Sequence, residues 1–343
     1  PDLSNSGQRM EIQDRAELCF PQLLNTSCRK PTSHRFQDVF VHVVLSSISV
    51  LIIVLNLLVI ISVSYFRQTL TSHFGKYKCL VSSMCSLSVS DFLVGSVLLP
   101  GDIYAQTQCW FLGEVMCSLC NYVINIVLSA SVGNMVLISI DRYVAICHPL
   151  HYPTRVTVTK AKLYVFLCWF CSFFCISIVF KDVLNQPSIT NSCDGECVVV
   201  FSNIAFVTDL ILNFIGPVIA IIFLYMRVFV VAVSQARAMR SHTAAVTHQH
   251  SVTLSKRKSE LKAARTLGVI VLVFLICFCP FYCVSLAGAS PYSVNVASIM
   301  YYMNSCLNPL IYALFYPWFR KAVKHIVTLQ ILQPGSSEVS MFK

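Results

Sequence analysis

The stretch NIAFVTDLILNFIGPVIAIIFLY, from Asn203 to Tyr225, is apolar over nearly its whole length but contains one aspartate, Asp209. About 20 residues of helix cross the hydrocarbon core of a bilayer, so this stretch predicts a membrane span. A carboxylate at that depth is costly unless it meets water or a cation, which makes Asp209 a candidate site residue. The partner that we expect is an amine from outside the cell. The alternative is a structural acid that is hydrogen-bonded to a neighbouring helix.

Apolar runs of similar length recur along the chain. Hydrophobic residues make up 56% of the 343 residues and charged residues only 12%, which is far from the average of soluble proteins. The further runs are Val43 to Tyr65, Cys79 to Ile103, Met116 to Ile146, Lys162 to Phe180, Ala263 to Ala287 and Tyr292 to Tyr316, with the fifth run ending at Leu224. We therefore predict an all-α membrane protein, a bundle of seven transmembrane helices.

The lysines and arginines predict the orientation of this bundle. They gather in the loops after spans one, three, five and seven, whereas the alternate loops carry only Lys181. Because basic residues favour the cytoplasmic side, the N-terminus is expected outside and the C-terminus inside. We expect an extracellular segment at 1–42, a seven-transmembrane domain at 43–316, and a cytoplasmic amphipathic helix and tail at 317–343. The helix suits the anionic inner leaflet. The basic cytoplasmic loops account for the net charge of +10, so nucleic-acid binding is not needed to explain it.

The outer segments contain an acceptor site and several cysteines. Asn25-Thr26-Ser27 is an N-glycosylation triplet, which has meaning only in the secretory lumen. No signal-peptide pattern precedes it, and we expect the first span to act as the insertion signal. Most of the 17 cysteines lie within spans and suit packing. Those on the oxidising side are able to form disulfides: Cys19, Cys28, Cys109, Cys117, Cys193 and Cys197.

Two bridges are expected among these outer cysteines. A bond from Cys117 to Cys197 would tie the loop after span four across the mouth of the bundle. Cys193 is then available to clamp the N-terminal segment, with Cys28 favoured over Cys19 as its partner. Cys109 is expected to remain a free thiol. Sequence does not decide the pairing.

Asp141-Arg142-Tyr143 stands at the inner end of span three. Glu260, at the start of span six, is the only acid in the inner loops. An ion pair between Arg142 and Glu260 would latch the two spans, and its opening would expose a cytoplasmic cleft. The alternative is that both charges reach independently to the interface.

The motifs together resemble those of the rhodopsin-like G-protein-coupled receptors over the whole membrane domain. The shared residues are Asn56, Leu87, Asp91, Asp141-Arg142-Tyr143, Trp169, Pro217, Pro280 and Asn308-Pro309-Leu310-Ile311-Tyr312. The run from Asn304 to Phe319, NSCLNPLIYALFYPWF, resembles the span-seven fingerprint of the trace amine-associated receptors. The paired cysteines of Cys193-Asp194-Gly195-Glu196-Cys197 are similar to those at the same place in that family.

One departure from the family pattern bears on ligand binding. Eighteen residues before Arg142, where most amine receptors carry the aspartate that holds the ammonium, this chain has Ile124. Asp209 instead occupies the span-five position used by a subgroup best known from fish. The resemblance therefore implies that the ammonium pairs with Asp209 beside Ile124. A dehydrated carboxylate and a dehydrated ammonium attract each other strongly at low dielectric.

Polar and aromatic residues on spans three, six and seven are candidate walls of this site. Asn121 and Asn125 lie four residues apart on one helix face and offer hydrogen bonds. Aromatic rings suit a cation, although plain packing is an equally good reading of rings at helical spacing: Phe278, Phe281, Tyr282, Tyr301 and Tyr302. Phe278 stands where the family usually has tryptophan, which puts the usual switch mechanics in doubt.

Asp91 is the other acid within a span. Its expected polar neighbours resemble the sodium pocket of the receptor family: Asn56, Ser131, Asn304, Ser305 and Asn308. Two readings are open, a Na⁺ site and a hydrated polar network that couples the helices. In either case Asp91 would modulate switching and not select the ligand.

The resemblance implies an olfactory receptor in the plasma membrane that is not an enzyme. An extracellular amine would shift the population of helix arrangements and free the cleft near Arg142 for a heterotrimeric G protein. Stimulatory coupling that raises cyclic AMP is the family expectation, with Asn308, Pro309 and Tyr312 in the switch. The alternative is a rhodopsin-like receptor for a non-amine ligand. A transporter would be expected to show internal repeats, and we find none.

Overall fold

The described part of the chain is a bundle of long helices. The computed structural model describes residues 18–23, 27–29, 36–65, 78–181, 183, 193–197, 199, 202–242, 268–269, 272–288 and 291–332. Five helical stretches there are long and apolar enough to cross a membrane: Val39–Tyr65, Leu80–Ala105, Gly113–Cys147, Val158–Val179 and Asn203–Val231. The shorter apolar helix Leu272–Leu286 and α13 (Pro291–Phe315) correspond to the predicted sixth and seventh spans.

Two of the spans are built from more than one helical segment. The second span consists of α4 (Lys78–Leu93), η1 (Val94–Leu98) and α5 (Leu99–Thr107), and the fifth of α10 (Asn203–Asp209), η3 (Leu210–Ile215) and α11 (Gly216–His242). The remaining elements are α2 (Phe36–Tyr65), α6 (Gly113–Cys147), α7 (Tyr152–Arg155), α8 (Val158–Val179), α14 (Pro317–Val327) and η4 (Gln330–Leu332).

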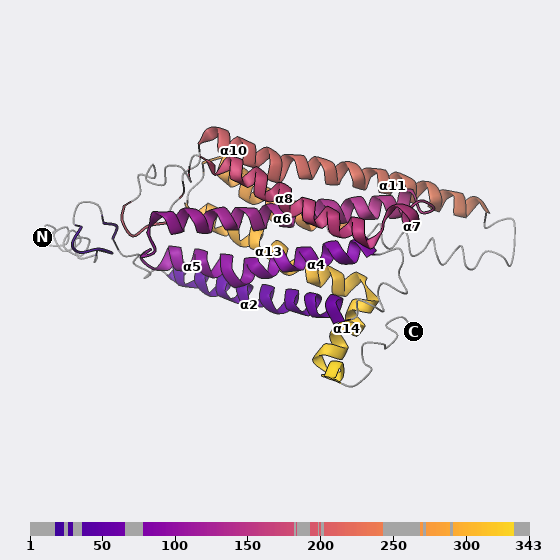
Figure 1. Ribbon diagram of the computed structural model, residues 1–343, viewed down its shortest axis with the longest axis horizontal. Coiled ribbons are helices and arrows are strands. Elements are labelled where there is room, and N and C mark those ends of the chain that lie inside the picture. Colours follow the sequence, from indigo (N-terminus) through magenta and orange to yellow (C-terminus); the bar gives the residue numbers. More distant parts are fainter. Residues whose placement is uncertain are drawn as a thin grey trace, which may run out of the picture.

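The long helix α6 runs through the middle of the bundle. It packs against α4, α8 and α11, while α13 packs against α2 and α4. Figure 1 shows these helices side by side along the long axis, with α14 turning away from the bundle at the end opposite the N-terminus. Side chains of α6 therefore meet several other spans, which makes it a natural wall for an internal site.

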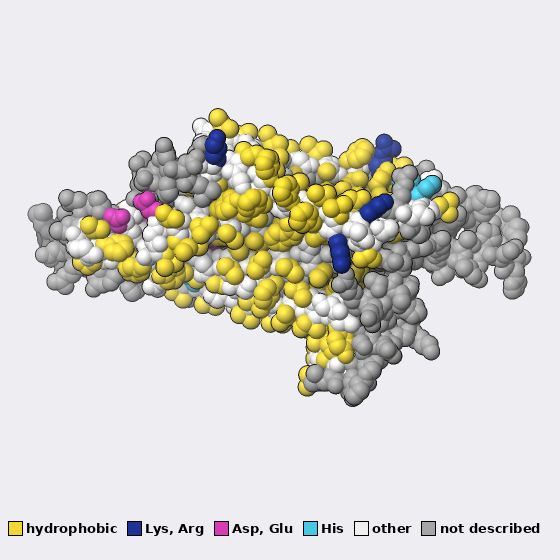
Figure 2. All heavy atoms as spheres, in the orientation of Figure 1, with side chains coloured by type: hydrophobic (Ala, Val, Ile, Leu, Met, Phe, Trp, Pro, Cys, Tyr) yellow, Lys and Arg dark blue, Asp and Glu magenta, His cyan; other side chains and the backbone are white. Residues whose placement is uncertain are grey.

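The sides of the bundle are apolar. On α8, Phe166, Phe170 and Phe174 are each more than half exposed, as expected for a surface that faces lipid tails. Figure 2 shows hydrophobic side chains over the middle of the visible face, with most of the visible lysines and arginines toward the end that carries α14. This distribution agrees with a multi-pass membrane protein whose C-terminal end lies inside.

The helix α14 joins the bundle through one apolar side. Trp318 and Phe319 are buried in the same hydrophobic cluster as Tyr312 of α13, whereas Lys324 is exposed. This is the arrangement expected of an amphipathic helix at a membrane surface.

The second and fifth spans each contain a π-helical turn, at η1 and η3, where the apolar pattern predicts only continuous helix. A π turn adds a residue to one helical turn and is frequent at functional sites. At η1, the Ser49 hydroxyl donates a 2.7 Å hydrogen bond to the Gly95 carbonyl. A Cβ at Gly95 would lie 2.7 Å from Cγ2 of Ile52, so the close approach of α2 requires glycine there.

Candidate ligand-binding site

A cavity of about 120 Å³ lies between the third, fifth, sixth and seventh spans. Its walls come from α6, from the junction of α10 and η3, from Leu272–Leu286 and from α13. The lining residues are Asn125, Leu128, Ser129, Val132, Asp209, Asn213, Phe281, Tyr282, Ser298, Tyr301 and Tyr302. Six of them are residues that the sequence pointed to: Asn125, Asp209, Phe281, Tyr282, Tyr301 and Tyr302.

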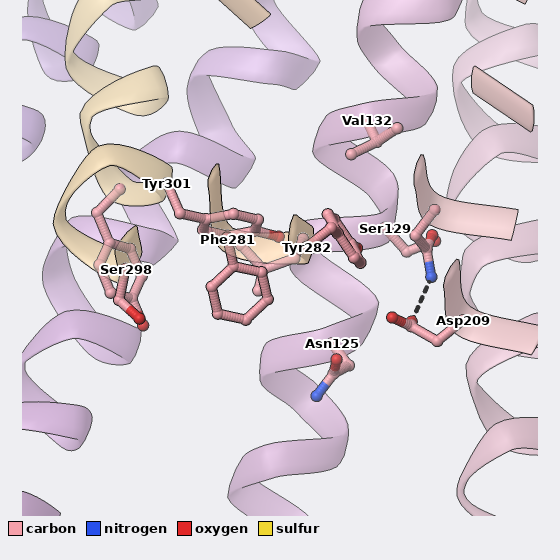
Figure 3. A pocket seen from close by; sticks show the side chains of 11 residues that line it. Asn125, Ser129, Val132, Asp209, Phe281, Tyr282, Ser298 and Tyr301 are labelled. Atoms are coloured by element: carbon pink, nitrogen blue, oxygen red, sulfur yellow. Dashed lines mark hydrogen bonds between the residues drawn. The ribbon is translucent and has the colours of Figure 1, made fainter. Parts of the chain in front are cut away.

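Asp209 is the last residue of α10 and directly precedes the π turn of η3. Its Oδ1 accepts a 2.7 Å hydrogen bond from the side-chain amide of Asn213. The side chain is partly buried, and no lysine or arginine of the described residues forms an ion pair with it. Figure 3 shows the carboxylate and its bond at one side of the cavity, opposite the aromatic side chains. The site thus presents a carboxylate that has a polar neighbour, Asn213, and no lysine or arginine partner within the described part of the chain.

The wall opposite Asp209 is aromatic. The rings of Phe281 and Tyr301 lie 5.1 Å apart between centroids, and Tyr282 stacks on Phe214 at 4.5 Å. Both tyrosines and Phe281 line the cavity (Figure 3). Aromatic faces attract cations, most strongly where water is excluded, so the chemistry of this wall complements the carboxylate.

Three of the expected site residues lie outside the cavity lining. Phe278 is 3% exposed and packs between Phe274 and Tyr301, with centroid distances of 4.4 and 4.6 Å. The amide of Asn121 donates to the Cys117 carbonyl at 3.0 Å. Ile124 packs on an apolar cluster that includes Val127 and Leu98. None of these three side chains lines the cavity.

Several lining residues were not anticipated, namely Leu128, Ser129, Val132, Asn213 and Ser298. Ser129 and Val132 follow Asn125 by four and seven residues on α6, and Asn213 follows Asp209 by four. Residues at this spacing lie on the same helix face as the candidate residue, so the spacing could have predicted them as lining residues. Ser298 stands one turn before Tyr302 on α13 and carried the same signal.

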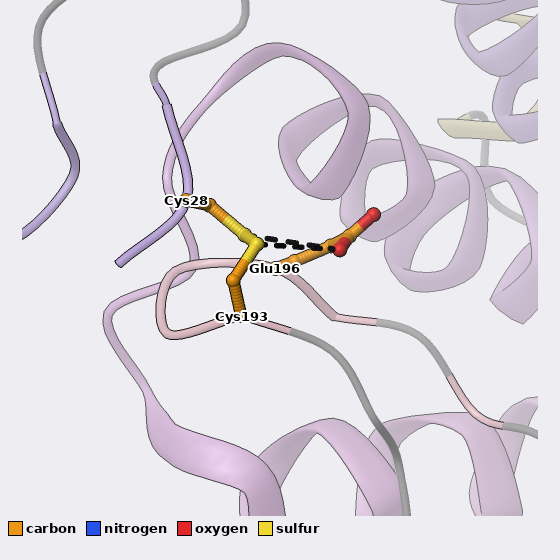
Figure 4. Close-up of side chains that lie close together, drawn as sticks. All are labelled: Cys28, Cys193 and Glu196. Atoms are coloured by element: carbon orange, nitrogen blue, oxygen red, sulfur yellow. Dashed lines mark hydrogen bonds between the residues drawn. A yellow bond between two sulfur atoms is a disulfide. The ribbon is translucent and has the colours of Figure 1, made fainter. Parts of the chain in front are cut away.

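The outer end of the bundle is closed by three disulfides, Cys19–Cys109, Cys28–Cys193 and Cys117–Cys197. The last two are the pairings favoured from the sequence. Glu196 Oε2 lies 3.8 Å from the sulfurs of Cys28 and Cys193 (Figure 4). Because those sulfurs are bonded to each other, they are neither proton donors nor thiolate ligands, and this group is no metal site.

The expectation that Cys109 is a free thiol was wrong. The N-terminal segment folds back on itself, with the Cys19 amide donating to the Cys28 carbonyl at 2.8 Å, and the Cys28 amide donating to the Asp194 carbonyl at 2.8 Å. The Trp110 amide also donates to the Gly195 carbonyl at 2.9 Å. These bonds bring the N-terminal segment between the two outer loops, which places Cys19 next to Cys109.

Asp91 lies in a second polar cluster, deeper in the bundle. The carboxylate is fully buried and accepts hydrogen bonds from the Ser305 hydroxyl at 2.8 Å and from the Asn308 amide at 3.0 Å. Ser131 donates instead to the Ser90 hydroxyl at 2.8 Å, and the Asn304 amide contacts Met135 Sδ at 3.9 Å. Of the expected neighbours, Ser305 and Asn308 contact Asp91 directly.

Comparison with known proteins identifies the family. A model of the 7 transmembrane receptor (rhodopsin family) matches residues 55–312. Trace amine-associated receptor 13c of Danio rerio is 34% identical over 341 residues, which cover 96% of this chain and 97% of the relative. Trace amine-associated receptor 6 of Homo sapiens is 34% identical over 353 residues, covering 99% and 98%. The chain belongs to the trace amine-associated receptors.

Other members of the family are similarly related to this trace amine-associated receptor. Trace amine-associated receptor 1 of Mus musculus is 31% identical over 334 residues, covering 93% of this chain and 98% of the relative. The family is one of multi-pass plasma-membrane receptors and not of enzymes.

The inner end of α6 in this trace amine-associated receptor carries a buried charge pair. Nε of Arg142 donates to Asp141 Oδ2 at 3.0 Å, and Nη2 of Arg142 contacts the same oxygen. The Tyr152 hydroxyl donates to the other oxygen, Oδ1, at 2.6 Å. Tyr152, on α7, was not anticipated from the sequence. Tyr143 packs against the apolar cluster of Ile146 and Val228, with its ring 5.8 Å from that of His148.

Two sequence expectations fall outside the described residues. Asn25, the glycosylation acceptor, is one of them, and Glu260, the expected partner of Arg142, is the other. Pro309 lies within α13, and Tyr312 is 2% exposed beside Phe319.

Proposed function

We propose that this receptor binds an extracellular amine whose ammonium group pairs with Asp209. The observation that carries the proposal is the Asp209 carboxylate facing an aromatic-walled cavity without a lysine or arginine partner among the described residues. Ile124, at the usual position of the ammonium anchor, packs in an apolar cluster and offers no charge. An entering ammonium would therefore find its counter-charge at Asp209, as the names of the trace amine-associated relatives also suggest.

The proposed signal passes from the cavity to the inner end of α6. Tyr282 and Tyr301 line the cavity and belong to the hydrophobic cluster that continues to Tyr312 and Trp318. Ligand binding would favour an arrangement of these packed helices in which Arg142 leaves Asp141 and a heterotrimeric G protein enters. Stimulatory coupling, a rise in cyclic AMP and an olfactory role are proposed on the resemblance to the family.

Na⁺ is proposed as an allosteric ion beside Asp91. The residues fit a hard cation, because the cluster offers a carboxylate and the Ser305 hydroxyl, and oxygen ligands suit such ions. The buried side-chain oxygens of Asn304, Asn56 and Asn134 have no hydrogen-bond partner among the described residues. A bound Na⁺ would neutralise the buried charge, and these residues would hold it between the first, second, third and seventh spans.

The experiment that tests the amine proposal compares Asp209→Asn with the wild-type receptor. Asparagine keeps the size of the side chain and removes its charge. Removing one partner of a buried ion pair costs about 3–5 kcal/mol, so the potency of amines should fall by roughly two to four decades. The readout is cyclic AMP accumulation with a panel of amines and uncharged analogues, at matched surface expression.

The control is Glu114→Gln, which removes an exposed carboxylate in the first turn of α6. Its amine response should equal that of the wild type. If Asp209→Asn keeps full potency for amines, or if uncharged analogues match the amines in the wild type, Asp209 is a structural acid and the ligand is not recognised by its charge.

A further inference from the structure

Two tyrosine hydroxyls in the wall of the cavity have no hydrogen-bond partner within the described part of the chain. The lining includes three tyrosines, and the hydroxyl of Tyr302 is already used, because it donates to the carboxylate of Asp102 on α5. The hydroxyls of Tyr282, in the sixth span, and Tyr301, on α13, form no such bond. Tyr282 is 5% exposed and Tyr301 is only partly exposed. Because a buried hydroxyl without a partner is destabilising, both groups favour a molecule that bonds to them in the cavity.

The other polar side chains of the lining are bonded to the protein or lie on another element. The Ser298 hydroxyl donates at 2.9 Å to a carbonyl one turn earlier on α13, and the Asn125 amide donates at 2.8 Å to a carbonyl one turn earlier on α6. Ser129 carries a further hydroxyl of the lining, but it belongs to α6 and not to the aromatic wall. The unused hydrogen-bonding capacity of that wall is therefore at Tyr282 and Tyr301.

The field of Asp209 gives these two hydroxyls a direction. Tyr282 and Tyr301 interact electrostatically with each other, and both interact with the Asp209 carboxylate, which lies across the cavity (Figure 3). Hydroxyl dipoles orient in the field of the protein, so the negative charge turns the O–H hydrogens toward the cavity. An ammonium group donates hydrogen bonds and accepts none, so it cannot serve these hydrogens. They require an acceptor on another part of the ligand.

The size of the cavity limits the length of such a ligand. A cavity of about 150 Å³ holds a benzene molecule, and this cavity has about 120 Å³. A ligand of roughly six non-hydrogen atoms therefore fills it. Because Asp209 and the aromatic wall lie on opposite sides of the cavity (Figure 3), a ligand with its ammonium at Asp209 has its other end at the wall.

We infer that the ligand is a short aliphatic amine with an oxygen acceptor toward the end remote from the ammonium, and that Tyr282 and Tyr301 determine specificity by donating hydrogen bonds to this oxygen. The inference rests on the proposed pairing of the ammonium with Asp209. An amine with only hydrocarbon at that end leaves both hydroxyls unpaired. A site built to hydrogen-bond its ligand rejects analogues without the polar group for this reason.

The test compares methoxypropylamine with ethoxyethylamine, two isomers that differ only in the position of the ether oxygen. Pentylamine has the same length and no oxygen. An ether oxygen accepts hydrogen bonds and donates none, so it tests for donors in the site. Cyclic AMP potency is measured at matched surface expression, and competition binding gives a readout that does not depend on the G protein. The wild type should distinguish the two isomers by at least about fivefold, the effect of one hydrogen bond.

Tyr282→Phe and Tyr301→Phe each remove one hydroxyl and keep the ring. Each should lower the potency of the preferred ether by about fivefold and change that of pentylamine by less than about twofold. The double variant should no longer distinguish the isomers. Because the two tyrosines are also changed singly, one variant serves if the other fails to reach the surface.

Two controls separate this effect from a general loss of a hydroxyl. Ser129→Ala removes a hydroxyl from the lining on the side of α6, and it should change the responses to the two isomers alike. Tyr164→Phe, on the exposed side of α8, should leave all responses unchanged.

Three results would overturn the oxygen contact while leaving Asp209 in place. The wild type does not distinguish the isomers, the phenylalanine variants weaken pentylamine as much as the ethers, or the wild type responds to other amines but to none of these three. Failure of the amine proposal has a different signature. Methoxybutane, in which a methyl group replaces the amino group of methoxypropylamine, would then act as strongly as the amine, and Asp209→Asn would leave the responses to both ethers unchanged.

Discussion

The side-chain amide of Asn213 donates a 2.7 Å hydrogen bond to the carboxylate of Asp209, across the π turn of η3. Both residues line the same cavity. The bond holds one carboxylate oxygen in place, and the orientation in Figure 3 leaves the carboxylate beside the cavity. The π turn and the hydrogen bond together position the charge that we propose as the ammonium anchor.

Replacing Asn213 with alanine should weaken amine binding without abolishing it. A hydrogen bond to a charged group contributes about 1.5–3 kcal/mol, so amine potency should fall by roughly tenfold to one hundredfold, less than for Asp209→Asn. Cyclic AMP dose–response curves at matched surface expression measure this. Asn121→Ala, which removes an amide outside the cavity lining, should leave potency unchanged, and an equal loss in both variants would contradict the role of Asn213.

Cys109 should resist thiol reagents in the intact receptor. Because it is bonded to Cys19, a membrane-impermeant maleimide should label it only after reduction. Cys19→Ser should expose the Cys109 thiol to labelling, and Cys19→Ser/Cys109→Ser should abolish that new signal. Mass spectrometry of labelled peptides locates the thiol. Labelling of Cys109 in the unreduced wild type would show that this bridge does not form.

The Tyr152→Phe substitution should raise ligand-independent signalling. The hydroxyl of Tyr152 donates to Asp141, the partner of Arg142, and its loss loosens the charge pair that covers the inner end of α6. A hydrogen bond of about 1 kcal/mol changes the ratio of two receptor states by roughly fivefold. Basal cyclic AMP per receptor at the surface is the measurement. Tyr164→Phe on the exposed side of α8 is the matched control, and an unchanged basal level in Tyr152→Phe would refute the prediction.

Sodium should lower amine affinity through Asp91. If Na⁺ stabilises one arrangement of the helices and the amine another, physiological Na⁺ should weaken amine binding by at least about fivefold, within the usual range of allosteric coupling. Competition binding in sodium buffer and in N-methylglucamine buffer measures the effect. Asp91→Asn should abolish it, while Asp194→Asn, an exposed outer acid, should preserve it. A sodium effect that survives in Asp91→Asn would place the ion elsewhere.

The apolar periodicity was sufficient to predict the spans, but it carried no information on their local geometry. The order of the seven spans follows from runs of about 20 apolar residues. The π turns at Val94–Leu98 and Leu210–Ile215 leave no such trace, because the residues in them are as apolar as those of the adjoining helix. The contacts of Gly95 with α2 illustrate a constraint that exists only once two helices pack.

The candidate site was predicted only in part, because residue type is visible in the sequence whereas packing neighbours are not. Asp209 was recognisable because an acid in an apolar span is costly wherever it lies. Phe278 and Phe281 looked alike in sequence, yet only Phe281 lines the cavity, while Phe278 is buried against Phe274. Aromatic residues three apart on one helix face different neighbours, and only the packed bundle decides which neighbour is a cavity.

By itself, the sequence determined the class of protein, its orientation, its family motifs and the acid at Asp209, because these depend on residue type and spacing along one chain. Only the tertiary structure decided which residues meet across the bundle. The bond between Tyr302 and Asp102 joins residues 200 positions apart, and the Cys19–Cys109 bridge spans 90 positions. Such contacts depend on how the helices and outer loops fold against one another, which no local pattern encodes.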